Sequence, residues 1–183
     1  MKKDDDLIAE ILGFWFSDES RGKWFKSTAE FDEEIRRRYE KTWGLARAGA
    51  YDHWEEDPDG ALALVIILDQ FPLNMFRDDA RQYSTEAHAR EVARHAIEKG
   101  FDKAMTPPQR AFLYLPFMHS ESLQDQQYAL QLYQQAGLDD NLRYAQHHHD
   151  VIERFGRFPH RNVALGREST AEELEYLEHT NGS

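Results

Sequence analysis

Three histidines stand side by side at His147, His148 and His149, in a chain whose net charge is −12. Consecutive side chains on a helix point about 100° apart, so these three cannot bind one metal ion together. His148 lies at the centre of an apolar helical face formed by Tyr144, Ala145, Val151, Ile152 and Phe155. We therefore expect His148 to face the interior, His147 to lie on the flank of that face, and His149 to point to solvent.

An inward-facing histidine can have two kinds of role. Its ring nitrogens can be bonded inside the core to a backbone carbonyl or a carboxylate, or one nitrogen can act as a general base or a ligand. A zinc site would need further histidine or carboxylate ligands, and His119, Glu121 and His160 are the residues best placed to supply them. No HExxH spacing is present. We predict that the protein holds no metal and no other cofactor.

The segment from Arg154 to Arg167 contains four arginines, one histidine and no acidic residue. Its arginines could pair with carboxylates and helix-end carbonyls, which would fix the last helix to the rest of the protein. Alternatively, they could hold the phosphate or carboxylate of a small ligand. In this second interpretation the loop contributes Arg157, His160, Arg161 and Asn162 to a ligand-binding site.

A third candidate is the stretch LDQFPLNMFR, residues 68–77. Asp69 falls on the apolar face of the helix predicted before it, and a buried aspartate requires a partner. Arg77 or one of the loop arginines could supply that partner, which would make the pair a core salt bridge at the turn of Pro72. Alternatively, Asp69 is a carboxylate placed for acid–base chemistry, with a pKa set by burial and by its partner.

Composition and motifs exclude several classes of protein. The chain has no cysteine, so thiolate zinc sites and cysteine nucleophiles are absent. Motifs of serine hydrolases, dinucleotide-binding proteins and P-loop enzymes are missing too. An acidic surface repels phosphates, so we expect no nucleic-acid partner. The N-terminal stretch MKKDDDLIAEILGFWF does not resemble a secretory signal, and no apolar run approaches the ~20 residues of a membrane span. We expect a cytoplasmic protein without membrane attachment, whose oligomeric state the sequence leaves open.

Apolar residues with helical spacing run along nearly the whole chain. Stripes of this kind cover residues 7–16 and 31–43, and the apolar run before Asp69 follows an Asp57–Pro58 cap. No stretch alternates apolar and polar residues as a half-buried strand would. Further helix starts are indicated at Ser84 or Thr85, Thr106, Ser122, Asp139 or Asp140, and Thr170. We therefore predict an all-α protein of about eight to nine helices.

Three joints between the predicted helices share one pattern. They are AGAYD at 48–52, KGFD at 99–102 and AGLDD at 136–140, and in each a glycine ends one helix shortly before the next begins. Such joints favour stacked antiparallel hairpins of the tetratricopeptide-like kind, with a compact bundle as the alternative. We predict a single domain over residues 1–180 and a disordered tail at residues 181–183.

The stretches LDQFPLNMFR, LPFMHSESLQDQ and FGRFPHRNVALGRESTAEE occur in an order that resembles the bacterial domain-of-unknown-function family 924. The resemblance extends from GFWF near the start to STAEE near the end, and it implies a tetratricopeptide-like helical fold. It implies no reaction, because the family has no established activity. The polar motif positions of the family fall on Asp69, Gln70, Asn74, Arg77, His119, Glu121, Gln126, His148, Asp150, Gly156, Arg157, His160, Arg161, Asn162 and Arg167.

Two comparisons with the family pattern concern the candidate site. The family has a single histidine within the span of the triplet, and it falls on His148. The family usually has arginine after the proline of DQFP, where this chain has Leu73. An anion site at that turn would therefore be weaker here, or Arg77 would supply the missing charge.

These observations predict binding of a small anionic metabolite or peptide in a polar groove lined by the DQFP, HSE and FGRFPHRN segments. The predicted ligand-binding residues are Asn74, Arg77, His119, Arg157, His160, Arg161 and Asn162. The alternative is a hydrolase-type acid–base enzyme that uses His148 with Asp69 or Glu121.

Overall fold

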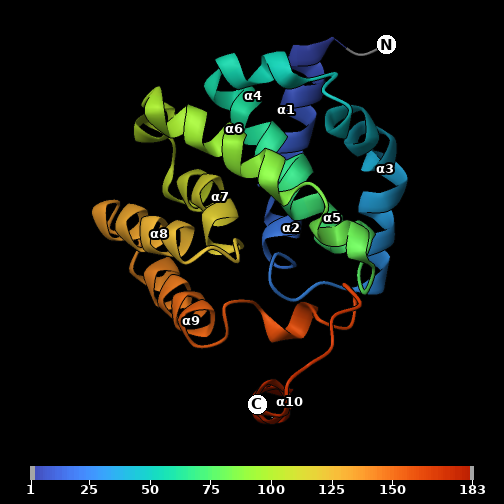
Figure 1. Cartoon of the computed structure of the whole chain (residues 1–183). Coiled ribbons are helices and arrows are strands. Elements are labelled where there is room, and N and C mark those ends of the chain that lie inside the picture. The colour runs from blue at the N-terminus through green and yellow to red at the C-terminus, as the bar shows by residue number, and fades with distance from the viewer. Residues whose placement is uncertain (1–2, 182–183) are drawn as a thin grey trace. The chain divides into compact units, whose positions relative to one another are not determined.

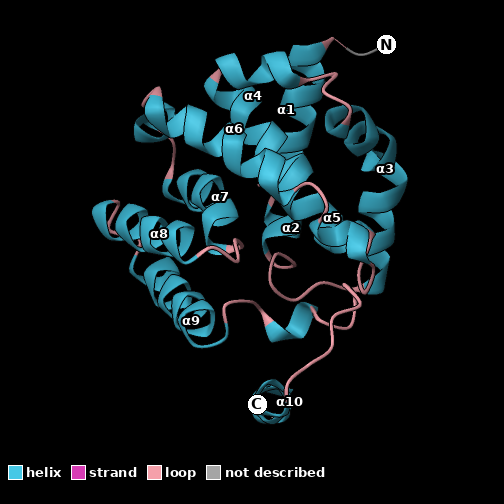
Figure 2. Cartoon of the chain, viewed as in Figure 1, coloured by secondary structure: helices cyan, strands magenta, loops and turns pink. Residues whose placement is uncertain are grey.

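The computed structural model describes residues 3–181, and within that range the chain is helical with no strand (Figures 1 and 2). The predicted all-α fold is confirmed. None of the helices in residues 3–181 combines the length and the apolar character needed to cross a membrane.

The chain divides into two compact units. The first consists of the chain up to Arg77 together with Arg81–Pro116, and the second of Asp78–Ala80 together with the chain from Phe117 onward. The single domain expected over residues 1–180 stays a prediction. Of the expected tail, Asn181 is the last residue of a helix, and residues 182–183 lie outside the described residues.

The first unit is built around one buried helical segment. Every residue from Gly60 to Gln70 is buried, and helices α1, α3 and α6 pack around this segment (Figure 1). A helix that is apolar on all sides is stable only when it is covered in this way. The elements are α1 (Asp4–Trp15), α2 (Asp18–Arg21), α3 (Ala29–Arg47), η1 (Asp52–Glu56), α4 (Pro58–Val65), η2 (Ile66–Gln70), α5 (Phe71–Met75), η3 (Ala80–Tyr83), α6 (Glu86–Glu98), η4 (Phe101–Ala104) and α7 (Pro107–Met118), of which η3 and α7 include residues of both units.

The buried segment stays helical past the predicted turn at Pro72. Proline has no N–H, so the carbonyl of Leu68, four residues earlier, loses its usual helical partner. The chain adapts by forming a π-helical turn, η2, in which the N–H of Phe71 donates to the carbonyl of Ile66. The hydroxyl of Thr85 then donates to the Leu68 carbonyl at 2.6 Å, which satisfies the group that Pro72 leaves open.

Thr85 therefore has a structural role beyond starting the next helix. Its Oγ1 also accepts a hydrogen bond of 3.1 Å from the indole Nε1–H of Trp43 in α3. Because this hydroxyl is fully engaged, Thr85 stands at the N-cap of α6 without making a side-chain cap bond. Two helices are thus tied to the buried segment through one hydroxyl group.

The second unit contains a helical hairpin and a long loop. Helices α8 (Leu123–Gln135) and α9 (Asp139–Phe155) pack against each other, and the loop carries η5 (Pro159–Arg161) before α10 (Ala171–Asn181). Gly137, with φ of 69°, ends α8 in the left-handed conformation that favours glycine, as the AGLDD joint predicted. Stacking of tetratricopeptide-like repeats along the chain stays a prediction.

The helix starts predicted at Thr106 and Thr170 both form as capping boxes. The backbone N–H of Thr106 donates to Gln109 at 3.1 Å, and that of Gln109 donates to Thr106 Oγ1 at 3.4 Å. Thr170 and Glu173 make the same reciprocal pair at 3.0 and 3.1 Å in front of α10. Local sequence signals thus place these two helix starts correctly.

Replacing Thr85 with valine is expected to lower the free energy of unfolding by about 2–4 kcal/mol, because it leaves two buried polar groups without their hydroxyl partner. Urea denaturation monitored by circular dichroism measures this change. The neighbouring variant Ser84→Ala removes an exposed hydroxyl bonded to Arg81 and should cost less than about 0.5 kcal/mol. Equal effects of the two variants would contradict the role given to Thr85.

Candidate functional site

Two histidines, His148 and His160, pack against Phe158 in the second unit, and the backbone of His119 is bonded to the same loop. We call His119, His148 and His160 the histidine cluster. Phe158 is 2% exposed. The rings of His148 and His160 each lie with their centroids 5.6 Å from it. The guanidinium of Arg161 lies 4.9 Å from the same ring, and its Nη2 donates to the backbone carbonyl of His119 at 2.8 Å. The HSE and FGRFPHRN segments are therefore brought together, as predicted.

The environment of His148 fixes its tautomer and its charge. Its Nδ1 lies 2.8 Å from the carbonyl of Tyr144. A carbonyl oxygen only accepts, so Nδ1 carries the proton and Nε2 keeps a lone pair. Burial lowers the pKa of His148 to about 4, and positive charge on His119, His147 and His160 acts in the same direction. His148 is therefore neutral at pH 7.

His160 experiences a similar field from a more open position. Its pKa is lowered to about 4, first by burial of the ring and then by the positive charges of Arg161 and His119. Part of the residue nevertheless reaches solvent in η5. Glu121 acts in the opposite direction without reversing the shift. Burial is thus the main cause of both pKa shifts, and nearby positive charges add to it.

The predicted orientations of two residues on α9 are wrong. The side chain of His149 is only 12% exposed and lies 3.2 Å from Asp150, whereas Tyr144, expected in the core, is 66% exposed. The reason is that α9 packs against α8 as well as against the Phe158 side, so more than one of its faces is covered. The shallow hollow on α9 at Asp140, Arg143, Tyr144 and His147 follows the outward face of this single helix.

Glu121 organises the loop around the histidine cluster. Arg167 binds its carboxylate with two hydrogen bonds of 2.9 and 3.1 Å, and the backbone N–H of Phe158 donates to it at 2.7 Å. Burial acts to raise the pKa of Glu121, but the bonds from Arg167 and Phe158 outweigh it, so the pKa is lowered. Its oxygens are thus ionised and occupied, which suits a positioning role better than that of a general base.

Glu173 organises the other end of the same loop. Arg157 donates to both of its oxygens at 2.9 and 2.8 Å, and Asn162 donates at 3.3 Å. Since Glu173 also accepts from the Thr170 N–H at the start of α10, one carboxylate joins loop and helix. The hydrogen bond from Arg157 is the main reason why the pKa of Glu173 is strongly lowered. The assignment of Arg157 and Asn162 to ligand binding stays a prediction.

Two predicted ligand-binding residues of the first unit meet a partner that the sequence did not indicate. Arg77 donates to Asp32 with Nε at 2.9 Å and with Nη2 at 3.1 Å. Asn74 donates to the same carboxylate at 2.8 Å, and Ser27 donates to it at 2.7 Å. Burial acts to raise the pKa of Asp32, but these hydrogen bonds keep it lowered. Asn74 and Arg77 thus form one network around Asp32.

Asp69 lies in η2 and is fully buried, as its apolar neighbours predicted. The amide of Gln70 donates to its Oδ2 at 2.6 Å. Its segment, DQFP, belongs to the first unit, whereas the HSE and FGRFPHRN segments belong to the second. A groove lined by all three segments stays a prediction.

Sequence reasoning gave no role to Gln126, although it closes the HSE turn. This residue is fully buried in α8, and its amide donates to the carbonyls of Met118 at 2.6 Å and Ser120 at 2.7 Å. The available signal was helical spacing, since Gln126 shares one face with the buried Ala129 and Tyr133. A polar residue on such a face is expected to satisfy main-chain groups.

The fold and these contacts define an all-helical protein with a histidine cluster held by carboxylate–arginine pairs. The chain belongs to the family described as bacterial protein of unknown function (DUF924), whose model matches residues 11–181. A solved structure of a protein of unknown function from Agrobacterium tumefaciens is similar, with 43% sequence identity and a TM-score of 0.91, covering 97% of this chain and 99% of that chain. No curated protein matches the chain. The resemblance seen in the motifs is thereby confirmed.

Glu121→Gln is expected to lower the free energy of unfolding by about 2–3 kcal/mol at pH 7, because the charged bonds to Arg167 are lost. The pKa of Glu121 in the folded protein is below its ordinary value of 4.5, so this contribution is complete above that pH and is lost as the pH falls below it. Urea denaturation at pH 7 and at lower pH measures both effects. The control Glu172→Gln, whose side chain is 61% exposed beside Arg154, should change stability by less than about 0.5 kcal/mol. A difference from wild type that stays constant with pH would contradict this assignment.

Proposed function

We propose that the protein binds a small anionic ligand at the histidine cluster of its second unit. The observation that supports this function is the packing of His148 and His160 around Phe158, beside the guanidinium of Arg161. The pKa values of both histidines are lowered to about 4, mainly by burial. Burial and neighbouring positive charges oppose a proton on these rings, and an anion would offset both effects. The site therefore gains more from a negatively charged ligand than from a neutral one.

The loop arginines support such a site in two ways. Their positive charges attract an anion, and their ion pairs fix the position of the loop. Arg157 is bound to Glu173 and Arg167 to Glu121, so their guanidinium groups hold the loop in place. The exposed position of His160 gives a ligand a route of access, and the cluster supplies the imidazole nitrogens that contact it. The proposal thus shifts the binding role from the loop arginines to the histidines.

Anion binding at this cluster is linked to proton uptake. A histidine whose pKa is about 4 in the free protein is neutral at pH 6, and a bound anion beside it raises that pKa. The complex then holds protons that the free protein does not. Affinity consequently increases as the pH falls, by up to about tenfold per pH unit for each proton taken up.

The expected result is that inorganic phosphate or succinate binds more tightly at pH 5.5 than at pH 7.5. Isothermal titration calorimetry in buffers of different ionisation enthalpy measures both the affinity and the number of protons taken up. His119→Gln and His160→Gln should weaken binding, whereas His179→Gln, an exposed residue of α10, should not. Binding that is independent of pH, or absent at both pH values, would contradict the proposal.

A second candidate function is acid–base catalysis by His148. The bond from its Nδ1–H to the Tyr144 carbonyl leaves Nε2 unprotonated at pH 7, which is the state that a general base needs. Of the two carboxylates considered as its partners, Glu121 is occupied by Arg167, so it is poorly placed to accept a proton from His148.

If His148 is a general base, His148→Gln should abolish turnover of ester or phosphoester substrates while the far-ultraviolet circular dichroism spectrum stays unchanged. The rate of turnover should fall only as the pH drops through about 4, because His148 must be neutral to accept a proton and becomes protonated in that range. His179 makes the same type of bond to the carbonyl four residues before it, so His179→Gln is the matched control. A broad substrate screen without turnover by the wild-type protein would rule out this candidate.

A further inference from the structure

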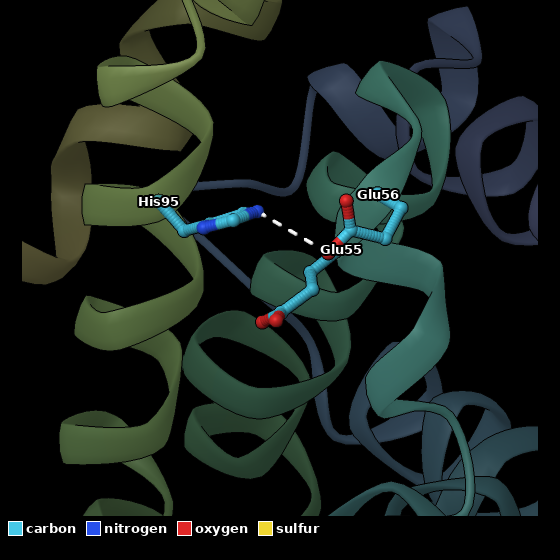
Figure 3. Close-up of side chains that lie close together, drawn as sticks. All are labelled: Glu55, Glu56 and His95. Carbon is cyan, nitrogen blue, oxygen red and sulfur yellow. Dashed lines mark ion pairs between the residues drawn. The ribbon is translucent and has the colours of Figure 1, made fainter.

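A second group of potential ligands lies in the first unit, where α6 packs against η1. Glu55 and Glu56 come from η1, and His95 reaches toward them from α6 (Figure 3). Each side chain offers one ligand atom, and the three atoms lie within 4.8 Å of one another. This arrangement does not involve any residue of the histidine cluster.

The imidazole of His95 supplies an independent indication that this group binds a ligand. Its Nε2 is buried and makes no hydrogen bond, although it lies 3.5 Å from Oε1 of Glu56. Two ligands of a tetrahedral zinc ion, each ~2.1 Å from the metal, are about 3.4 Å apart. The observed separation is that of an ion pair, and it also fits two atoms that share a metal ion.

We propose that Glu55, Glu56 and His95 bind a divalent transition-metal ion of the Zn²⁺ or Mn²⁺ type. One imidazole and two carboxylates form a ligand set that both ions accept, with water completing the coordination. The segment DHWEEDPD, residues 52–59, carries five acidic residues and one histidine, so its field attracts cations. The site is separate from the anion site, and either could exist without the other.

Lys99 is the competing cation at this site. Its Nζ lies 3.5 Å from Oε2 of Glu56, and its side chain is 48% exposed. A bound metal ion would displace this ammonium group, which is free to move into solvent. Removing Lys99 should therefore strengthen metal binding, a result that a role of these residues in ion pairing alone does not predict.

The same interface contains a matched control. His88 lies seven residues before His95 on α6, and its Nε2 is 3.2 Å from Oδ1 of Asp52. The side chains of His88 and His95 are 31% and 30% exposed, so the two histidines differ mainly in the number of carboxylates they face. If these residues only form ion pairs, replacing His88 and replacing His95 should have similar effects on metal binding.

The test is titration of the full-length, tag-free protein with Zn²⁺ and with Mn²⁺, followed by isothermal titration calorimetry and, for Mn²⁺, electron paramagnetic resonance. His95→Gln and Glu56→Gln should weaken binding about tenfold or more, His88→Gln should leave it unchanged, and Lys99→Met should tighten it severalfold. Circular dichroism confirms that each variant is folded.

Two outcomes would overturn the proposal. One is the absence of measurable binding of either ion by the wild-type protein. The other is binding that His95→Gln leaves intact and His147→Gln removes, which would assign the metal to the exposed histidine of the triplet. Neither outcome bears on the proton-linked binding of phosphate, so the two sites are tested separately.

Discussion

The carboxylate of Glu121 is the point at which separate segments of the second unit are joined. It follows α7 in the chain, binds the guanidinium of Arg167 ahead of α10, and accepts the N–H of Phe158 in the loop between them. A carboxylate partly removed from water is stable only with such partners, because burial of an unpaired charge is strongly unfavourable. The position of Phe158 follows from this arrangement, and the rings of His148 and His160 pack against Phe158. The histidine cluster is thus a consequence of an ion pair formed 46 residues apart along the chain.

Local signals in the sequence were sufficient for several of the helix boundaries. Capping boxes at Thr106 and Thr170 and a glycine at the AGLDD joint place their elements because each depends on residues within a few positions of one another. The prediction failed at Pro72, where the helix continues. Its continuation depends on a hydroxyl from Thr85, which lies 17 residues from the carbonyl it satisfies. Long-range compensation of this kind has no local pattern.

The candidate site was predictable in part for the same reason. The spacing of apolar residues on helical faces was enough to predict that Asp69 is buried. The HSE and FGRFPHRN segments do meet within one unit. Which arginine pairs with which carboxylate could not be inferred, since Glu121, Glu173 and Asp32 are equivalent to any other acid when only the sequence is considered. His149 was misplaced because a single apolar stripe does not reveal that α9 is covered on a further side.

The π-helical turn η2 also sets the register of the residues that follow it in the buried segment. A π-helical turn closes its hydrogen bond over one residue more than an α-helical turn. One residue corresponds to about 100° of rotation, so everything after η2 is turned relative to an uninterrupted helix. Asn74 and Arg77 face Asp32 in the present register. An uninterrupted α-helix of the same sequence would turn a different set of side chains toward Asp32.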